Sequence, residues 1–197
     1  DAENEIRNYL FENEATEDNN FGPYQNIFMS RALDKKAQLY CQDGGLVSTL
    51  LSYGLMSGTI DSAILAGKGK ASPLFRGPEL ATNISEILQN AGTGYTYSPN
   101  LTALTSRENL QCKSTALVGT PCHINALRTL QARGLGKKYT KKVPLAIGLF
   151  CSKCFTKELY YSKIKKELGV NLEDIVKIDI KGKLLLHLIS GETVSIS

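Results

Sequence analysis

The sequence contains no apolar run long enough to cross a membrane. Its longest apolar stretch, residues 143–150, is far shorter than the roughly 20 residues that a membrane-spanning helix requires. The N-terminal residues also lack the basic and then apolar segments of a secretory signal. We therefore predict a soluble, cytoplasmic protein without a transmembrane segment.

The sequence also lacks a concentrated basic patch. The chain carries a formal net charge of +4, of which residues 1–20, with seven acidic side chains and one arginine, contribute −6. Residues 21–197 therefore carry +10. This balance suits acidic cofactors or partner surfaces, but no basic stretch is interleaved with aromatic residues, so nucleic acid is not an expected partner.

Cysteines are few and odd in number. Five cysteines in 197 residues do not form a disulfide framework, and three of them lie near predicted strand ends, which is typical of metal or redox chemistry in a reducing compartment. No Ser–His–Asp order and no pair of catalytic carboxylates can be assigned. The cysteines are therefore the main carriers of chemistry in this sequence.

Neither end of the sequence has a terminal signal. The first residue is not Met, and residues 192–197 alternate as a strand does. We expect the sequence to be a piece of a longer chain. Within it we predict an acidic linker or tail over residues 1–20 and one main domain over residues 21–197.

Apolar periodicity predicts alternating helices and strands. Apolar residues at helical spacing, including Leu46, Val47, Leu50, Leu51, Leu55 and Met56, predict a buried helical stripe. We predict strands at 26–31, 60–66, 115–118 and 143–150, helices at 34–41, 44–57, 85–90, 122–130 and 158–168, loops at 91–100 and 134–142, and a hairpin at 176–189. This order predicts an α/β fold: a mixed, partly parallel sheet flanked by helices, with a C-terminal hairpin.

A strand, a tight turn and a helix over residues 115–130 place Cys122 at the carboxyl end of a strand. Ligands bind at that edge of an open α/β sheet, and the free N–H groups of a helix start favour a thiolate. Cys151 and Cys154 follow the strand at 143–150. If the two strands are parallel, the three thiols emerge at the same edge.

Three converging thiols suit an iron–sulfur cluster, with a fourth ligand from beyond Ser197. Zinc bound by the same cysteines and His123 is a second possibility. Ordinary buried cysteines or a thiol redox pair at Cys151 and Cys154 remain a third. Cys41 and Cys112 are expected to be core or surface residues, and His187 a structural histidine.

Two glycine-containing segments can approach a ligand with bare backbone. Residues 42–45, Gln-Asp-Gly-Gly, precede a predicted helix and offer free N–H groups to a phosphate or a planar ring. The alternative is a plain N-cap by Asp43. The loop at 91–100 adds the hydroxyl groups of Thr93, Tyr95 and Ser98. The lysines at 137, 138, 141 and 142 are interpreted as a solvated loop.

Four motifs taken in order resemble the coenzyme F420 hydrogenase/dehydrogenase beta-subunit family. They are the segments at 42–45, 91–99, 118–122 and 147–151. The family includes the flavin subunit of deazaflavin-reducing hydrogenases, related formate and quinone-linked dehydrogenase subunits, and 7-hydroxymethyl chlorophyll a reductase. The resemblance implies an oxidoreductase subunit that binds FAD and iron–sulfur clusters and passes electrons between a deazaflavin hydride carrier and a redox partner.

The resemblance also implies roles for individual residues. The flavin-binding residues would be Gln42, Asp43, Gly44, Gly45, Thr93, Tyr95, Ser98 and Thr120. The ligands of a 4Fe–4S cluster would be Cys122, Cys151 and Cys154, an incomplete set because the family's further cysteine pair is absent here. A non-catalytic electron-transfer or scaffold subunit and a zinc-stabilised binding domain are the alternative functions.

Overall fold

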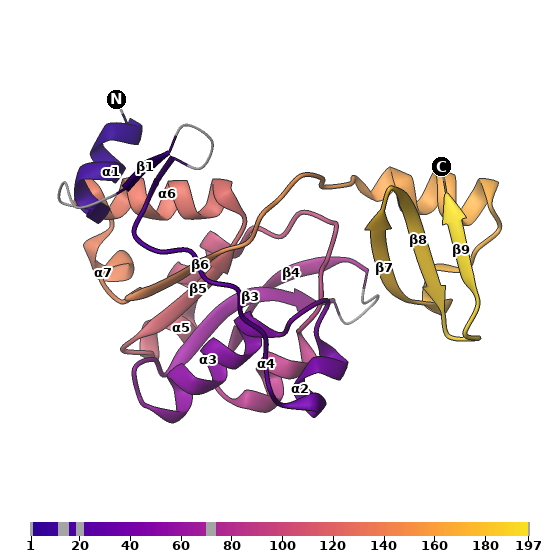
Figure 1. Ribbon diagram of the computed structural model, residues 1–197, viewed down its shortest axis with the longest axis horizontal. Helices are drawn as coiled ribbons and strands as arrows, with labels where there is room; N and C mark the ends of the chain where they lie inside the picture. Colours follow the sequence, from indigo (N-terminus) through magenta and orange to yellow (C-terminus); the bar gives the residue numbers. More distant parts are fainter. Residues whose placement is uncertain (1, 12–15, 19–21, 70–73, 197) are drawn as a thin grey trace.

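The structure, a computed structural model, describes residues 2–11, 16–18, 22–69 and 74–196 (Figure 1). Its centre is a four-stranded sheet in the order β4-β3-β5-β6. The strands are β3 (Ser62–Lys68), β4 (Arg76–Ala81), β5 (Thr115–Gly119) and β6 (Leu145–Gly148). Strands β3, β5 and β6 are parallel, and β4 runs antiparallel to β3. The predicted mixed α/β sheet is confirmed.

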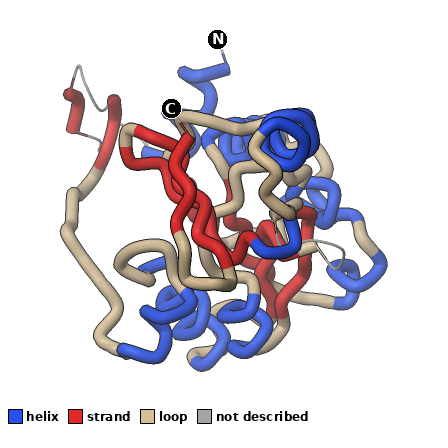
Figure 2. The backbone as a smooth tube through the Cα atoms, turned by 90° about the vertical axis from the view of Figure 1, so that its right-hand side faces the viewer, coloured by secondary structure: helices blue, strands red, loops and turns tan. Residues whose placement is uncertain are grey.

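Helices cover both faces of this sheet because alternate residues of its buried strands are apolar on both sides (Figure 2). In β3, Ala63 and Leu65 pack with α3 (Leu46–Met56) and α4 (Ile84–Gln89). Ile64 faces the other way, toward a cluster that includes Leu127 of α6 (Pro121–Ala132). The result is a helix–sheet–helix sandwich with a core on each face.

A second sheet forms a separate unit at the C-terminal end (Figure 1). It contains β7 (Ile175–Lys181), β8 (Lys183–Leu188) and β9 (Thr193–Ile196), all antiparallel. One face of this sheet is apolar and packs on η2 (Leu159–Glu167) and η3 (Leu172–Asp174), where Tyr160 and Ile164 are buried. The predicted hairpin is confirmed and gains a third strand, and the predicted helix at 158–168 is a π-helix.

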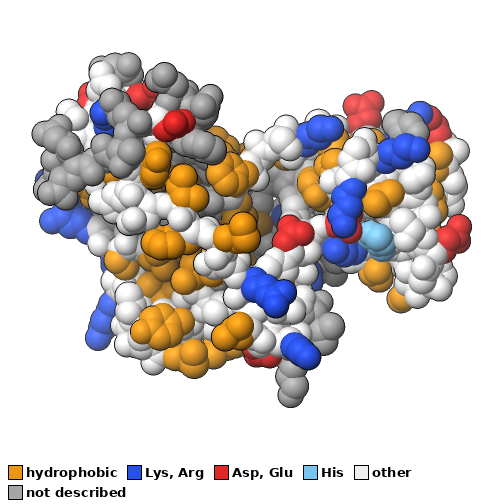
Figure 3. Space-filling model, viewed as in Figure 1, with side chains coloured by type: hydrophobic (Ala, Val, Ile, Leu, Met, Phe, Trp, Pro, Cys, Tyr) orange, Lys and Arg blue, Asp and Glu red, His pale blue; other side chains and the backbone are white. Residues whose placement is uncertain are grey.

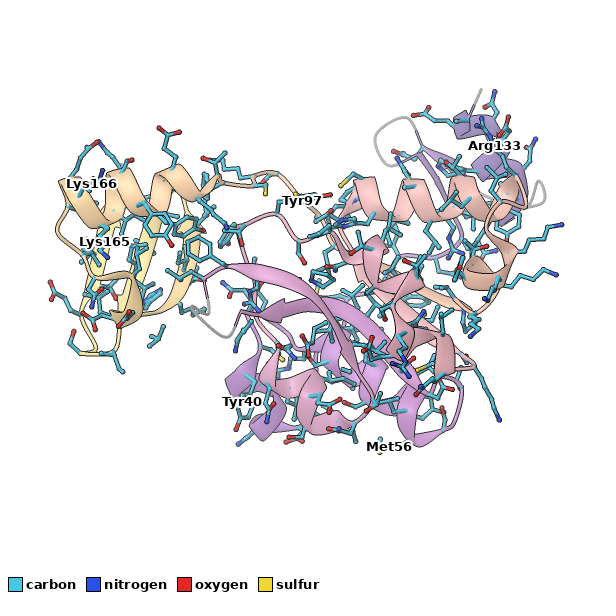
Figure 4. The ribbon with its side chains drawn as sticks, turned by 180° about the vertical axis from the view of Figure 1, so that it is seen from behind. Tyr40, Met56, Tyr97, Arg133, Lys165 and Lys166 are labelled. Atoms are coloured by element: carbon cyan, nitrogen blue, oxygen red, sulfur yellow. The ribbon has the colours of Figure 1, made fainter. Side chains whose placement is uncertain are left out.

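The remaining elements surround the main sheet. They are α1 (Ala2–Phe11), β1 (Thr16–Asp18), β2 (Gly22–Tyr24), α2 (Lys35–Tyr40), η1 (Asn100–Thr105), α5 (Arg107–Gln111) and α7 (Lys137–Thr140). Helix α1 lies beside α6, where Arg133 Nε is 2.7 Å from Glu5 Oε2 (Figure 4). The assignment of residues 1–20 as a linker or tail stays a prediction.

Two local expectations were wrong. Residues 26–31 form no strand, and Ile27, Phe28 and Met29 expose 67%, 81% and 102% of their surface. The run pairs with no strand of the described chain, so propensity alone did not make it part of a sheet. The predicted loop at 134–142 contains the short helix α7.

The helical stripe predicted on α3 is buried only in part. Leu51 is 1% exposed, whereas Leu46, Leu50 and Met56 expose 40%, 43% and 70%. Figure 3 shows hydrophobic side chains over the face where residues 25–34 and α3 lie. One side of α3 therefore packs on the sheet and the other is a surface. Within the described ranges, no helix combines the length and the apolar character that crossing a membrane demands.

Candidate functional site

A cavity of about 290 Å³ lies between the loop at 91–95, the segment after α2 and strand β7. Its wall therefore comes from both the main domain and the C-terminal unit. The lining residues are Tyr40, Cys41, Gln42, Lys68, Leu74, Arg76, Ala91, Gly92, Thr93, Gly94, Tyr95, Tyr160, Val176, Lys177 and Ile178.

Arg76 provides a positive charge at this cavity. Its guanidinium group donates hydrogen bonds of 3.3–3.4 Å to the carbonyl oxygens of Ala66, Asn90, Gly92 and Thr93. Its Nε is buried and has no hydrogen-bond partner, and burial lowers its pKa. No described carboxylate pairs with it. A half-buried cation without a counter-ion favours an anionic ligand.

Two lysines add to this positive wall. Partial burial and the charge of Arg76 lower the pKa of Lys68. Lys177 lines the cavity from β7, and its Nζ lies 3.2 Å from Asp179 Oδ2. The charged side chains that line the cavity are therefore all basic, and the buried carboxylate of Asp179, which pairs with Lys177, is not among the lining residues.

The glycine-rich loop is fixed in place around Arg76. A Cβ atom at Gly94 would overlap the side chain of Arg76, so only glycine fits there. Thr96 Oγ1 accepts from the Arg76 N–H at 2.9 Å and donates to the Leu74 carbonyl at 3.1 Å. The Phe155 N–H donates to the Tyr95 carbonyl at 2.7 Å. This last bond joins the loop to the segment that carries Cys151 and Cys154.

Two tyrosines at the cavity keep their phenol protons at neutral pH. Burial raises the pKa of Tyr160 to about 12. Burial and the charge of Asp179 also raise the pKa of Tyr95. Both phenols are therefore hydrogen-bond donors and not anions.

Gln42 connects the cavity to the C-terminal sheet. Its side-chain Nε2 donates to Asp179 Oδ1, and Asp179 is only 5% exposed. His187 Nε2 lies 2.9 Å from Asp179 Oδ2, and His187 Nδ1 lies 3.1 Å from Thr193 Oγ1. Both ring nitrogens of His187 have partners, so the prediction of a structural histidine is confirmed.

Burial raises the pKa of Asp179, but hydrogen bonds from Lys177 and His187 outweigh it, and the pKa is lowered overall. Asp179 is therefore ionised at neutral pH. An ionised carboxylate only accepts hydrogen bonds.

The three predicted cluster cysteines lie at one edge of the main sheet. Gly119 and Gly148 pair in the parallel β5 and β6, so Cys122 and Cys151 follow neighbouring strand ends, as expected. All three thiols are exposed. Burial raises the pKa of Cys154, and the nearby charges of Cys151 and Cys122 raise it further.

No three Cys, His, Asp or Glu side chains in the described part of the chain lie close enough to hold a metal ion. Cluster binding by Cys122, Cys151 and Cys154 therefore remains a prediction. Thr120 Oγ1 lies 3.1 Å from Cys122 Sγ at the start of α6. His123, the fourth ligand of the zinc alternative, is buried and uses Nδ1 to cap α6 with Thr120. Burial lowers its pKa.

Among the predicted flavin-binding residues, Gln42, Thr93 and Tyr95 lie together on the cavity. The others lie outside its lining. Gly45, at φ 70°, is the N-cap of α3 without a side-chain bond, so the alternative of an Asp43 cap was wrong. Gly44 is beside Arg31. Ser98 is buried and donates to Asn100 Oδ1 at 2.6 Å. Flavin binding by this set remains a prediction.

Several cavity residues were missed from the sequence. Cys41 immediately precedes Gln42, so its proximity was a usable signal. The other missed residues come from separate strands and helices, and no local pattern groups them. They include Lys68, Arg76, Tyr160 and Lys177.

The fold and the site define an α/β domain with a basic ligand cavity beside a cysteine-bearing sheet edge. Two family models of the coenzyme F420 hydrogenase/dehydrogenase beta subunit match the chain. The model of the N-terminal part matches residues 27–105, and the model of the C-terminal part matches residues 112–197. The chain belongs to the coenzyme F420 hydrogenase/dehydrogenase beta-subunit family.

Curated relatives agree with this assignment. The chain is 32% identical over 178 residues to the coenzyme F420 hydrogenase subunit beta of Methanococcus voltae, covering 89% of this chain and 63% of the relative. It is 34% identical over 171 residues to that of Methanothermobacter thermautotrophicus, covering 84% and 60%. A coenzyme F420-dependent sulfite reductase of Methanocaldococcus jannaschii is 35% identical over 80% of this chain and 26% of the relative.

A solved structure has the same fold. A chain of the F420-reducing NiFe hydrogenase complex from Methanosarcina barkeri matches with a TM-score of 0.79 and 27% identity, covering 92% of this chain and 63% of that chain. The chain thus spans about three fifths of the length of these hydrogenase relatives.

Proposed function

We propose that this chain is an electron-transfer module of a coenzyme F420-linked oxidoreductase. It holds FAD in the cavity and an iron–sulfur cluster at Cys122, Cys151 and Cys154. It passes electrons between a deazaflavin hydride carrier and an iron–sulfur redox partner. The observation that carries the proposal is the hydrogen bond from Phe155 N–H to the Tyr95 carbonyl, which joins the cavity loop to the cysteine segment.

The residues of the cavity fit an anionic cofactor with a planar ring. Arg76 has a buried Nε without a partner, and Lys68 and Lys177 add positive charge. A volume of about 290 Å³ lies at the lower end of small-molecule sites, about 300–1,000 Å³, so the cavity suits part of a dinucleotide. Tyr95 and Tyr160 supply neutral donors and apolar faces.

A bound flavin supplies the exchange of a hydride on one side and of single electrons on the other. The chain's own residues hold it. Arg76 orders the backbone of Gly92 and Thr93, and Tyr160, only 1% exposed, excludes water from one wall.

The sheet edge that carries Cys122, Cys151 and Cys154 offers three of the four ligands that an iron–sulfur cluster takes. Burial, and then the charges of Cys151 and Cys122, raise the pKa of Cys154, and a bound cation would favour its thiolate. A 4Fe–4S cluster takes four cysteines, so a further ligand must come from outside these three.

The test is cofactor analysis of the anaerobically purified chain, with and without Cys122→Ser. We expect flavin absorption bands and bound iron in the wild type. Cys122→Ser should lose most of the iron and keep its flavin and its circular dichroism spectrum. Cys112→Ser, half-buried beside α5, is the matched control and should keep both cofactors.

The other outcomes separate the alternatives. A cluster spectrum without flavin would indicate an electron-transfer or scaffold subunit, and a colourless protein with zinc would indicate a binding domain. Unchanged iron in Cys122→Ser would remove this residue from the ligand set.

A further inference from the structure

We infer that Asp179, supported by His187, is a positioning residue that fixes the amide of Gln42 so that its Oε1 is a hydrogen-bond acceptor at the cavity. The cavity then selects a ring that presents an N–H group. This inference rests on the proposed function, because the expected ring is that of a flavin or a deazaflavin.

A polar row crosses the C-terminal sheet behind Gln42. In the strand register, Lys177 pairs with His187, and His187 pairs with Thr193. Asp179 follows two residues after Lys177, so both side chains lie on the same face, opposite the apolar face that packs on η2. Register therefore brings Asp179, His187 and Thr193 side by side.

The direction of each hydrogen bond in this row follows from the carboxylate. Asp179 accepts only, so Gln42 must offer its Nε2 and His187 must carry a proton on Nε2. The other ring nitrogen, His187 Nδ1, lies 3.1 Å from the hydroxyl of Thr193. The chain of bonds leaves one orientation for the Gln42 amide.

That orientation leaves the Gln42 oxygen for a ligand. Within the described residues, the bond to Asp179 is the one hydrogen bond found for the Gln42 side chain. Gln42 lines the cavity, whereas Asp179 lies behind it and is 5% exposed. Asp179 therefore acts through Gln42.

With Gln42 Oε1 as an acceptor, the cavity distinguishes a ring that carries an N–H group from one that lacks it. The pyrimidine edge of a flavin or a deazaflavin carries an N–H between two carbonyl groups. A flavin methylated at that nitrogen, N3, lacks the donor and would leave Oε1 unpaired. Sites built to bind a polar group reject analogues that lack it strongly.

The experiment compares Asp179→Asn with the wild-type chain. The introduced asparagine has the size of the aspartate but also donates, so the Gln42 amide is free to turn and present Nε2. The matched control is Asp174→Asn, an exposed aspartate in η3 of the same unit. Fluorescence titration of the apoprotein would measure the affinities of FAD and of N3-methyl FAD.

We expect the wild type and Asp174→Asn to bind N3-methyl FAD at least about 10-fold more weakly than FAD. In Asp179→Asn this ratio should fall to about 3-fold or less. An unchanged ratio in a variant that still binds FAD would overturn the positioning role and leave the proposed function intact.

A second measurement does not depend on a ligand. The side-chain amide resonance of Gln42, followed by nitrogen-15 NMR in the apoprotein, should shift in Asp179→Asn and stay in place in Asp174→Asn. If the wild type binds no flavin, the proposed function fails. An unshifted Gln42 resonance overturns the positioning role by itself.

Discussion

At the scale of single residues, Arg76 is distinguished by having no carboxylate partner among the described residues. Arg76 satisfies its guanidinium group with four carbonyl oxygens and still has a buried Nε without a partner. Carbonyl groups share the hydrogen bonds but do not neutralise the charge. An anionic group in the cavity would do so, which explains why the side chain is held in place by backbone rather than by a carboxylate.

Gly94→Ala tests this arrangement. The added Cβ would overlap the side chain of Arg76, so it should displace the guanidinium group from Gly92 and Thr93 and weaken FAD binding about 10-fold. Gly77→Ala is the control, because a Cβ at Gly77 meets nothing within 4 Å. Equal affinities in the two variants, measured by fluorescence titration, would contradict the role given to Arg76.

At the scale of elements, the loop at 91–100 is fixed to the sheet at its far end. Asn100 Nδ2 donates to the Val118 carbonyl at 2.8 Å, and Asn100 Oδ1 accepts from Ser98 at 2.6 Å. Both Ser98 and Asn100 are buried. Ser98 therefore holds the loop and is not a cavity residue.

Asn100→Ala should lower the free energy of unfolding by about 1–3 kcal/mol, because it leaves a buried carbonyl and a buried hydroxyl without partners. Urea denaturation measures this loss. Asn125→Ala, at an exposed position of α6, should change it little. A loss at Asn100 no larger than at Asn125 would show that the loop is held by other contacts.

The elements also show what sequence patterns reveal and what they miss. The sequence predicts β5 because residues 116–118 are an apolar run, and it predicts α6 because Ile124, Leu127 and Leu130 recur at helical spacing. Residues 26–31 had the same strand character but found no partner strand.

The sequence predicts only those residues of the candidate site that lie in short local motifs. The motif residues Gln42, Thr93 and Tyr95 reach the cavity. Asp179 contacts Gln42 across 137 positions of sequence, and that pairing depends on the register of β7 and β8. Tertiary register of this kind leaves no local pattern.

At the scale of the whole molecule, low pH should weaken the contact between the main domain and the C-terminal sheet, to which Asp179 contributes. Asp179 has a lowered pKa when folded, so the stability it contributes is present above its unfolded pKa of about 3.9 and is lost as pH falls through the lower folded pKa. The wild type should therefore exceed Asp179→Asn in stability at pH 7, with the difference disappearing below that folded pKa. Urea denaturation across pH measures it, and a difference independent of pH would contradict the ionised carboxylate.

The cavity between the main domain and the C-terminal sheet has a consequence for local opening. The apolar cluster under the C-terminal sheet also includes Leu74 and Phe75 from the main domain, and the hydrogen bonds between the two parts include Gln42 to Asp179 and Phe155 to Tyr95. Local opening of the C-terminal sheet would break these contacts and expose its amides to exchange with deuterium. A ligand that touches both Arg76 and Lys177 would raise the free energy of that opening by RT ln(1 + [L]/Kd). Slower deuterium uptake in β7, β8 and β9 would thus show that a ligand occupies the cavity, although of these strands only β7 contributes to the cavity lining.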